Sequence, residues 1–154
     1  MIAIRAMGAH DLDQVLALEG ITPEAPHWDR AVYERLLVPD ESGAGYIALA
    51  AFDDRALAGF IVARQILEVC EIESIAVAEG FRRMGVGRVL LDAVSRRAQA
   101  LGTERIQLEV RAGNQNAIRF YEKAGLTKEG VRRRYYRSPE EDAVLMGKSL
   151  NSRD

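Results

Sequence analysis

The stretch Ile75–Leu91, IAVAEGFRRMGVGRVLL, decides the fold of this chain. It has the pattern of a strand end, a turn and the first turns of an amphipathic helix. The turn contains Gly85 and Gly87 beside Arg82 and Arg83. The first amide groups of a helix lack intrahelical partners and carry a partial positive charge, so such a turn can bind phosphate or pyrophosphate. Glycines let the backbone approach the ligand, and arginines add charge and hydrogen bonds.

The composition is that of an ordinary globular protein with one domain. The chain has 154 residues, one cysteine and a formal net charge of -2, so we expect a single domain over residues 1–154 and no bulk attraction for nucleic acid or anionic lipid. Because no stretch has membrane-spanning length and no secretory signal is evident, we expect a soluble cytoplasmic protein, a monomer or weak dimer. Cys70 lies in an apparent buried strand and is expected to be a core residue. His10 and His27 have no neighbouring ligand set, so no metal is expected.

Apolar periodicity and turn residues predict the order of the elements. Strands are expected at Ile2–Ala6, Gly45–Phe52, 57–66, Cys70–Val77, Arg105–Val110, Thr127–Arg134 and Ala143–Leu150. Helices are expected after a capping Asp11 as far as Gly20, near Trp28–Val38, from the glycine turn to Gly102, and between Asn114 or Asn116 and Gly125. Val89 is expected on the buried side of the third helix, and residues 137–142 (RSPEED) should connect the last two strands. This order predicts an α/β (α+β) fold, a mixed sheet with helices on both faces and a right-handed parallel crossover.

Three motifs in this order resemble one enzyme family. Residues Arg82–Gly87, RRMGVG, match the [Arg/Gln]-x-x-Gly-x-[Gly/Ala] loop of the GNAT acetyltransferases. LEVRAGNQNAIRFYEKAGL at Leu108–Leu126 and VRRRYYRSPEEDAVLM at Val131–Met146 resemble the bacterial RimI branch, the alanine N-acetyltransferases of a small-subunit ribosomal protein. The resemblance runs from about Cys70 to the C-terminus, and the first half matches loosely, by element order and Trp28. It implies the acyl-CoA N-acyltransferase fold, with about seven strands and four helices, and acetyl-CoA as cosubstrate without a metal.

The resemblance assigns residues of this chain to acetyl-CoA. The main chain of Ile75, Ala76 and Val77 would line the pantetheine arm, much as an added strand would. The pyrophosphate cradle would consist of Arg83, Met84, Gly85, Val86, Gly87 and Arg88, acting largely through backbone amides. Asn114 is the remaining implied cofactor contact. It is also an expected helix N-cap, and the two roles are compatible.

The resemblance also carries a general base onto Glu109 and a general acid onto Tyr121. A protonated amine has no lone pair and must lose a proton before it attacks a thioester, and the departing thiolate benefits from gaining one. Tyrosine, with a reference pKa of about 10, is protonated at neutral pH and can donate. Glu71 and Glu73 are rival bases, since many enzymes of the family take the base from the strand before the loop. Glu73 shares strand parity with Ile75 and is therefore expected on the same sheet face.

The expected reaction is direct acetyl transfer in a ternary complex to a protein N-terminus, by resemblance the N-terminal alanine of a ribosomal protein. An α-amino group has a reference pKa of about 7.7–8.0 against about 10.4 for lysine, so it is easier to neutralise. Two alternatives stay open. One is a GNAT acetyltransferase for lysine side chains or a small amine, and the other is a CoA-binding sensor without turnover. Glu109 and Tyr121 argue against the sensor, which needs only the cradle.

The most basic run of the chain, residues 132–137 (RRRYYR), has three interpretations. It can be a solvated hairpin end whose arginines pair with the acidic residues 140–142. By family resemblance it can instead cover the peptide cleft, with Tyr135 and Tyr136 holding the first substrate residues. Arginines with aromatics can also dock RNA, a contact expected here only through the ribosome. Trp28 is open to a packing role or a substrate contact.

Overall fold

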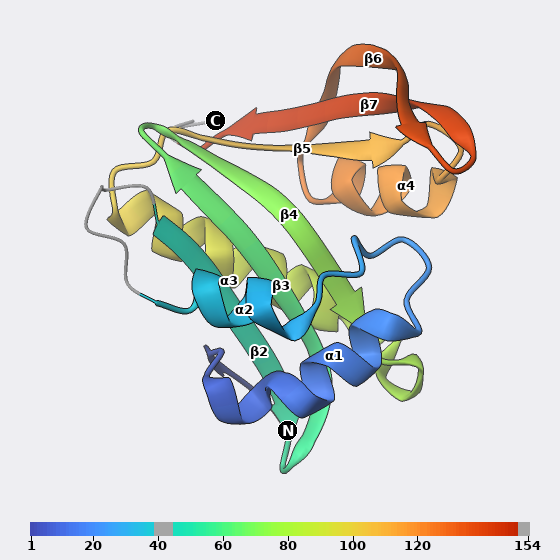
Figure 1. Ribbon diagram of the computed structural model, residues 1–154. Helices are drawn as coiled ribbons and strands as arrows, with labels where there is room; N and C mark the ends of the chain where they lie inside the picture. Colours follow the sequence, from blue (N-terminus) through green and yellow to red (C-terminus); the bar gives the residue numbers. More distant parts are fainter. Residues whose placement is uncertain (39–44, 151–154) are drawn as a thin grey trace.

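The computed structural model describes residues 1–38 and 45–150, and its elements follow the predicted order (Figure 1). The strands are β1 (Ile2–Ala6), β2 (Gly45–Asp53), β3 (Ala56–Ile66), β4 (Val69–Val77), β5 (Arg105–Arg111), β6 (Thr127–Arg137) and β7 (Glu140–Ser149). The helices are α1 (Leu12–Gly20), α2 (Arg30–Leu36), α3 (Val86–Ala100) and α4 (Gln115–Lys123), with short 3₁₀ turns η1 (Ala9–Asp11) and η2 (Glu79–Phe81). In this described part of the chain, no helix is both long and apolar enough to cross a membrane.

The seven strands form one mixed sheet in the order β1-β2-β3-β4-β5-β7-β6. All neighbours are antiparallel except β4 and β5, which form the predicted parallel crossover through α3. Their register covers only Val69 to Glu71 of β4 against Arg105 to Gln107 of β5. Beyond these pairs the two strands diverge, and Figure 1 shows β5, β6, β7 and α4 as a wing set apart from β2, β3 and β4. The sheet therefore opens into a V at its centre.

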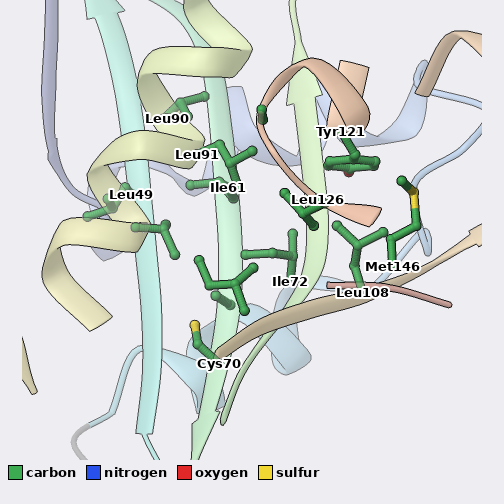
Figure 2. Close-up of a cluster of buried hydrophobic side chains, with 14 of the residues drawn as sticks. Leu49, Ile61, Cys70, Ile72, Leu90, Leu91, Leu108, Tyr121, Leu126 and Met146 are labelled. Carbon is green, nitrogen blue, oxygen red and sulfur yellow. The ribbon is translucent and has the colours of Figure 1, made fainter. Parts of the chain in front are cut away.

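Helices cover both faces of the sheet, as predicted, and each face has its own core. The larger hydrophobic cluster lies between the sheet and helices α3 and α4. Figure 2 shows Leu90 and Leu91 of α3 beside Ile61 of β3 in this cluster. The smaller cluster lies against α1 and α2 and contains the fully buried Tyr33 and Phe60. Both clusters pack against β2, β3 and β4, which makes these strands the rigid base of the V.

Some local predictions differ from the structure. Asp11 does not cap α1 with its side chain, because its carboxylate is paired with Arg5 (2.7 Å) and accepts the Gly8 amide (2.8 Å). Val89 is 44% exposed, and Leu91 takes its place in the core. The predicted core role of Cys70 is confirmed, since the residue is fully buried and burial raises the pKa of its thiol to about 11.

The predicted connection over residues 137–142 is wrong. β6 runs to Arg137 and β7 starts at Glu140, so only Ser138 and Pro139 form the turn. Tyr135 and Tyr136 accordingly lie within β6. β6 is an edge strand that is exposed along most of its length, so its sequence lacks the apolar alternation that marks a half-buried strand.

Candidate active site

A cavity of about 660 Å³ lies in the V between β4 and β5. Its walls come from the second half of β4, the end of β5, the first turns of α4 and the loop residues 22–25. Glu109 of β5 and Tyr121 of α4, the two predicted catalytic residues, both line it. Glu73, Asn114 and Tyr136 line it as well. The fold thus brings residues from four separate segments to one cleft.

A second cavity of about 570 Å³ lies at the N-terminus of α3, beside α4. It shares Val77 and Phe120 with the first cavity, so the two spaces adjoin. Five cationic side chains line it: Arg82, Arg83, Arg88, Arg119 and Lys123. Together with the free amide groups of the helix start, these cations suit a ligand that carries several phosphate groups. We call this cavity the donor end and the first cavity the acceptor end.

The glycine turn has the conformation that its sequence predicts. Gly85 is the N-cap of α3 with φ of 81°, a left-handed conformation that other residues adopt only with strain. A Cβ atom on Gly87 would lie 3.3 Å from Cζ of Phe120, so a larger residue would crowd α4. Arg82 donates from Nε to the carbonyl oxygen of Val77 (3.2 Å) and fixes the turn to the end of β4. Arg83 has φ of 63°, which bends the chain into the helix.

The remaining predicted cradle residues have distinct surroundings. Met84 is exposed, whereas Val86 is buried in the larger core. Arg88 donates to Asp92 (3.0 Å) and to the carbonyl oxygen of Lys123 (3.2 Å), so its side chain ties α3 to the end of α4. Arg88 still lines the donor end, so its guanidinium adds charge there beside the backbone amides of α3. The predicted contribution through amides is consistent with this arrangement.

Asn114 is the N-cap of α4, one of the two predicted alternatives. Its Oδ1 accepts the amide of Ala117 (3.2 Å), and the residue also lines the acceptor end. Asn116 lies two residues further along the chain, where its Oδ1 accepts a hydrogen bond from Arg119. The cap position and the cleft position of Asn114 therefore coexist.

A β-bulge in β4 changes the direction of its side chains at the cleft. Val62 of β3 pairs with Ser74 and Ala63 pairs with Ile72, so Glu73 has no partner in the register. Ile72 and Ile75 both pack against the larger core although their sequence parity differs. The bulge has reversed the alternation between them.

The prediction that Glu73 shares a face with Ile75 is therefore wrong, because it assumed an unbroken strand. Its charged neighbours are Glu71 and Arg64. Burial and then the charge of Glu71 raise the pKa of Glu73, and Arg64 opposes this shift. Glu71 and Glu73 form an acidic pair on β4 at the acceptor end.

Glu109 is held among groups from β6. Its side chain is 16% exposed, and its Oε1 lies 3.1 Å from Nε of Arg132. The negative charge of Glu109, and next a hydrogen bond to it, raises the pKa of Tyr135. The ring of Tyr136 lines the cleft below the guanidinium of Arg111, 4.2 Å from the ring centroid. The carboxylate therefore faces both a cation and a phenol.

A second irregularity, in β6, lies beside these groups. Arg132 pairs with Ala143 and Tyr136 pairs with Glu141, so β6 advances four positions while β7 advances two. Arg134 has φ of 53°, and its amide donates to Asp142 Oδ1 (2.8 Å). We call residues 133–135 the β6 bulge.

Tyr121 has the properties of a proton donor. It is 6% exposed and packs edge to face with Phe120, with ring centroids 5.1 Å apart. Figure 2 shows the ring on α4 at the margin of the larger core. Burial, with a smaller contribution from Tyr136, raises its pKa well above the usual range. The phenol therefore keeps its proton at neutral and moderately alkaline pH.

Trp28 lies in the connection between α1 and α2 and packs against the smaller core. Its ring contacts Tyr33 edge to face, with centroids 5.7 Å apart, and its amide donates to Glu19 Oε2 (3.1 Å). The Tyr33 hydroxyl donates to the same oxygen at 2.6 Å. From this loop, residues 22–25 line the acceptor end. The buried carboxylate of Glu19 thus joins α1, α2 and the loop.

Sequence reasoning missed several of these residues. Arg119 and Lys123 are four residues apart on α4, so both cations lie on one face of that helix. This spacing is the signal that could have indicated their place at the donor end. The sequence shows Arg132 only as part of a basic run. It gives no sign that Glu19 is buried and hydrogen-bonded, because its partners lie 9 and 14 residues away.

Comparison with known proteins places this geometry in context. Residues 10–126 match the acetyltransferase (GNAT) family. The "[Ribosomal protein bS18]-alanine N-acetyltransferase" of Salmonella typhimurium is 35% identical over 106 residues, which cover 68% of this chain and 72% of that protein. An N-alpha-acetyltransferase of Sulfurisphaera tokodaii is 41% identical over 80 residues, 51% of this chain and 47% of that one. The crystal structure of the ribosomal-protein-S18-alanine N-acetyltransferase from Escherichia coli superposes with a TM-score of 0.85 at 26% identity, covering 100% of this chain and 97% of that one.

Proposed function

Because the chain belongs to the acetyltransferase (GNAT) family, we propose that this acetyltransferase acts on the N-terminal α-amino group of a protein, with acetyl-CoA as the donor. One observation carries the proposal: Glu109 and Tyr121 line the same cleft, and that cleft adjoins the cationic glycine turn. A donor held at the turn and an acceptor entering the V would meet between the two residues.

The donor end fits acetyl-CoA by its chemistry. Phosphate groups would bind to the amides of residues 83–88, with further charge from Arg119 and Lys123. The β5-facing edge of β4 is unpaired with strand from Ile72 onward in the described chain, so Ile75, Ala76 and Val77 can offer main-chain groups to the amides of the pantetheine arm. Asn114 lies at the junction with the acceptor end.

The proposed chemistry assigns a role in proton transfer to each catalytic residue. Acetyl-CoA supplies an acetyl group on a thioester. Glu109 accepts a proton from the acceptor ammonium, directly or through a water, and the neutral nitrogen can then form its bond to the acetyl carbon. As the carbon–sulfur bond breaks, Tyr121 donates its proton to the sulfur, so that CoA leaves as a thiol. The nitrogen, which still carries one proton too many after the attack, returns that proton to the phenolate of Tyr121, and Glu109 releases the first proton to water. The raised pKa of Tyr121 supports this role, because the donor stays protonated at neutral pH.

The acceptor is proposed to be a protein chain that begins with alanine, such as a small-subunit ribosomal protein. The names of the relatives support this substrate, since they describe N-acetyltransferases that act on an alanine of ribosomal protein bS18. Tyr136 and Glu73 line the end of the cleft that such a chain would enter, and Tyr135 borders Glu109. Trp28 is proposed to act from beneath, by supporting the loop at residues 22–25.

The test is an acetylation assay with matched peptides. Purified protein is incubated with acetyl-CoA and a peptide beginning with alanine, and free thiol and peptide mass are followed. The controls are the same peptide with a blocked N-terminus and an internal lysine, and a panel of small amines. We expect one acetyl group on the α-nitrogen of the free peptide and none on the blocked one.

Two outcomes would contradict the proposal in different ways. Acetylation of the blocked peptide or of small amines alone would favour a lysine or small-amine acetyltransferase. Tight CoA binding without transfer to any peptide, amine or intact ribosomal protein would favour a sensor that lacks turnover.

A further inference from the structure

We propose that Arg132 is a stand-in for the acceptor: in the substrate-free protein its guanidinium occupies the position on Glu109 that the acceptor ammonium takes during the reaction. This inference rests on the proposed function, because it assumes that Glu109 receives the amine. It adds that the acceptor enters as a cation and must displace another cation first.

The geometry of the contact suits exchange. The ion pair joins Nε of Arg132 to Oε1 of Glu109 at 3.1 Å. The side chain of Arg132 is 57% exposed, whereas that of Glu109 is 16% exposed. Because water reaches the arginine side of the pair, the attraction is screened and releasing Arg132 requires little free energy. The carboxylate lines the cleft and stays in place.

The surroundings give the released side chain an alternative. The guanidinium of Arg132 lies 5.5 Å from the ring centroid of Tyr135, so the cation can rest on that aromatic face after it leaves the carboxylate. Arg132 borders the β6 bulge and Tyr135 lies in it, where the ladder to β7 is interrupted. The side chain can therefore move without breaking a regular strand pair.

Charge balance at the cleft favours a cation in this position. Glu109 faces Arg132, Tyr135 and Tyr136 from β6, while Glu71 and Glu73 lie on β4 opposite. Arg111, the other nearby guanidinium, is already engaged by Glu141 at 3.2 Å and by the ring of Tyr136. When Arg132 leaves, the acceptor ammonium restores the same charge next to Glu109. A neutral or blocked acceptor cannot do so.

The experiment compares two neighbouring arginines. Arg132→Met removes the competing cation, whereas Arg133→Met removes a cation that has no ion-pair partner within residues 1–38 and 45–150. Steady-state kinetics with the alanine peptide are measured for both, together with peptide binding in the presence of CoA. We expect Arg132→Met to lower KM and Kd for the peptide about two- to fivefold, the range that matches the strength of an exposed ion pair. KM for acetyl-CoA should not change, Arg133→Met should match the wild type, and Arg132→Lys should restore the wild-type KM.

Two results would overturn the inference. A higher peptide KM or a tenfold lower kcat in Arg132→Met would mean that Arg132 stays on Glu109 or holds the bound peptide. An unchanged peptide KM and Kd would mean that the pair does not compete with the acceptor. Both differ from failure of the proposed function, in which the wild-type protein itself would acetylate no peptide N-terminus.

Discussion

The shape of the donor end comes mainly from the backbone, whereas that of the acceptor end comes mainly from side chains. At the donor end the shape comes from the backbone, through the left-handed Gly85, the close approach of Gly87 to Phe120 and the start of α3. At the acceptor end it comes from side chains of β4, β5 and β6, beside one irregularity in β4 and one in β6. A donor common to a whole family needs one fixed backbone cradle. An acceptor that differs between family members needs a surface that single substitutions can alter.

The sharpest separation of the two ends is expected from Glu109→Gln. The amide cannot take the proton of the acceptor, so kcat should fall by about 10²–10⁴, the usual contribution of a positioned base. Affinity for CoA, measured by calorimetry, should stay at the wild-type value because the donor end is untouched. Glu73→Gln is the matched control and should keep most of its turnover. If Glu73→Gln abolished activity while Glu109→Gln retained it, the base would have to be reassigned to β4.

Tyr121→Phe tests the proposed proton donor, which lines the acceptor end. We expect kcat to fall about a hundredfold, toward the lower limit for a positioned proton donor. Burial raises the pKa of Tyr121, so the phenol stays protonated above the usual tyrosine range near pH 10 and kcat of the wild type should not fall between pH 8 and 9.5 through its ionisation. The measurement is kcat as a function of pH over this range, for the wild type and for Tyr121→Phe. A wild-type decline that is missing from Tyr121→Phe would show that the tyrosine ionises earlier.

Gly85→Val tests the backbone of the donor end. A β-branched residue at φ of 81° carries about 1–3 kcal/mol of strain, so the turn should shift and affinity for acetyl-CoA should fall about tenfold. Peptide KM at saturating acetyl-CoA should change little. Gly80→Ala is the control, because a Cβ there meets nothing within 4 Å and φ is not positive. If both variants lost the same affinity for acetyl-CoA, the cause would be the added side chain itself and not backbone strain at Gly85.

The smallest effect is expected from Tyr33→Phe, which acts on the acceptor end from a distance. It removes the 2.6 Å hydrogen bond to the buried carboxylate of Glu19, at a cost of about 1–3 kcal/mol in the free energy of unfolding. The loop at residues 22–25 should loosen, and peptide KM should rise about threefold, equivalent to about 0.7 kcal/mol. Denaturation curves and kinetics measure the two effects, and the exposed Tyr46→Phe is the control. A change in KM for acetyl-CoA instead would break the separation of the two ends.

The donor end was predictable because its shape depends on residue types with unusual backbone behaviour. Glycines at 85 and 87 mark the turn, and the asparagine cap of α4 is a short-range feature. The strands with one buried face were also predictable, since alternation of apolar residues follows directly from the geometry of a strand. β6 was misjudged at its end because an exposed edge strand has no such alternation.

The acceptor end was less predictable for a physical reason. A bulge adds one residue to a strand and reverses every later side chain, yet nothing in the residues around Glu73 distinguishes them from a regular strand. The partnership of Arg132 with Glu109 joins residues from two strands that do not neighbour each other in the sheet. Parity counting gave the wrong face for Glu73 because of the bulge in β4.

The early end of the pairing between β4 and β5 also bears on self-association. An unpaired strand edge is normally a template for aggregation, and here such an edge lies in the middle of a sheet. The wing formed by β5, β6, β7 and α4 lies across the V from it, so a strand of a second molecule would have to enter the V to reach it (Figure 1). In a fragment that ends before β5, the same edge of β4 would be open to pairing with other molecules. The second half of the chain therefore shields the first from self-association, in addition to supplying Glu109 and Tyr121 to the cleft.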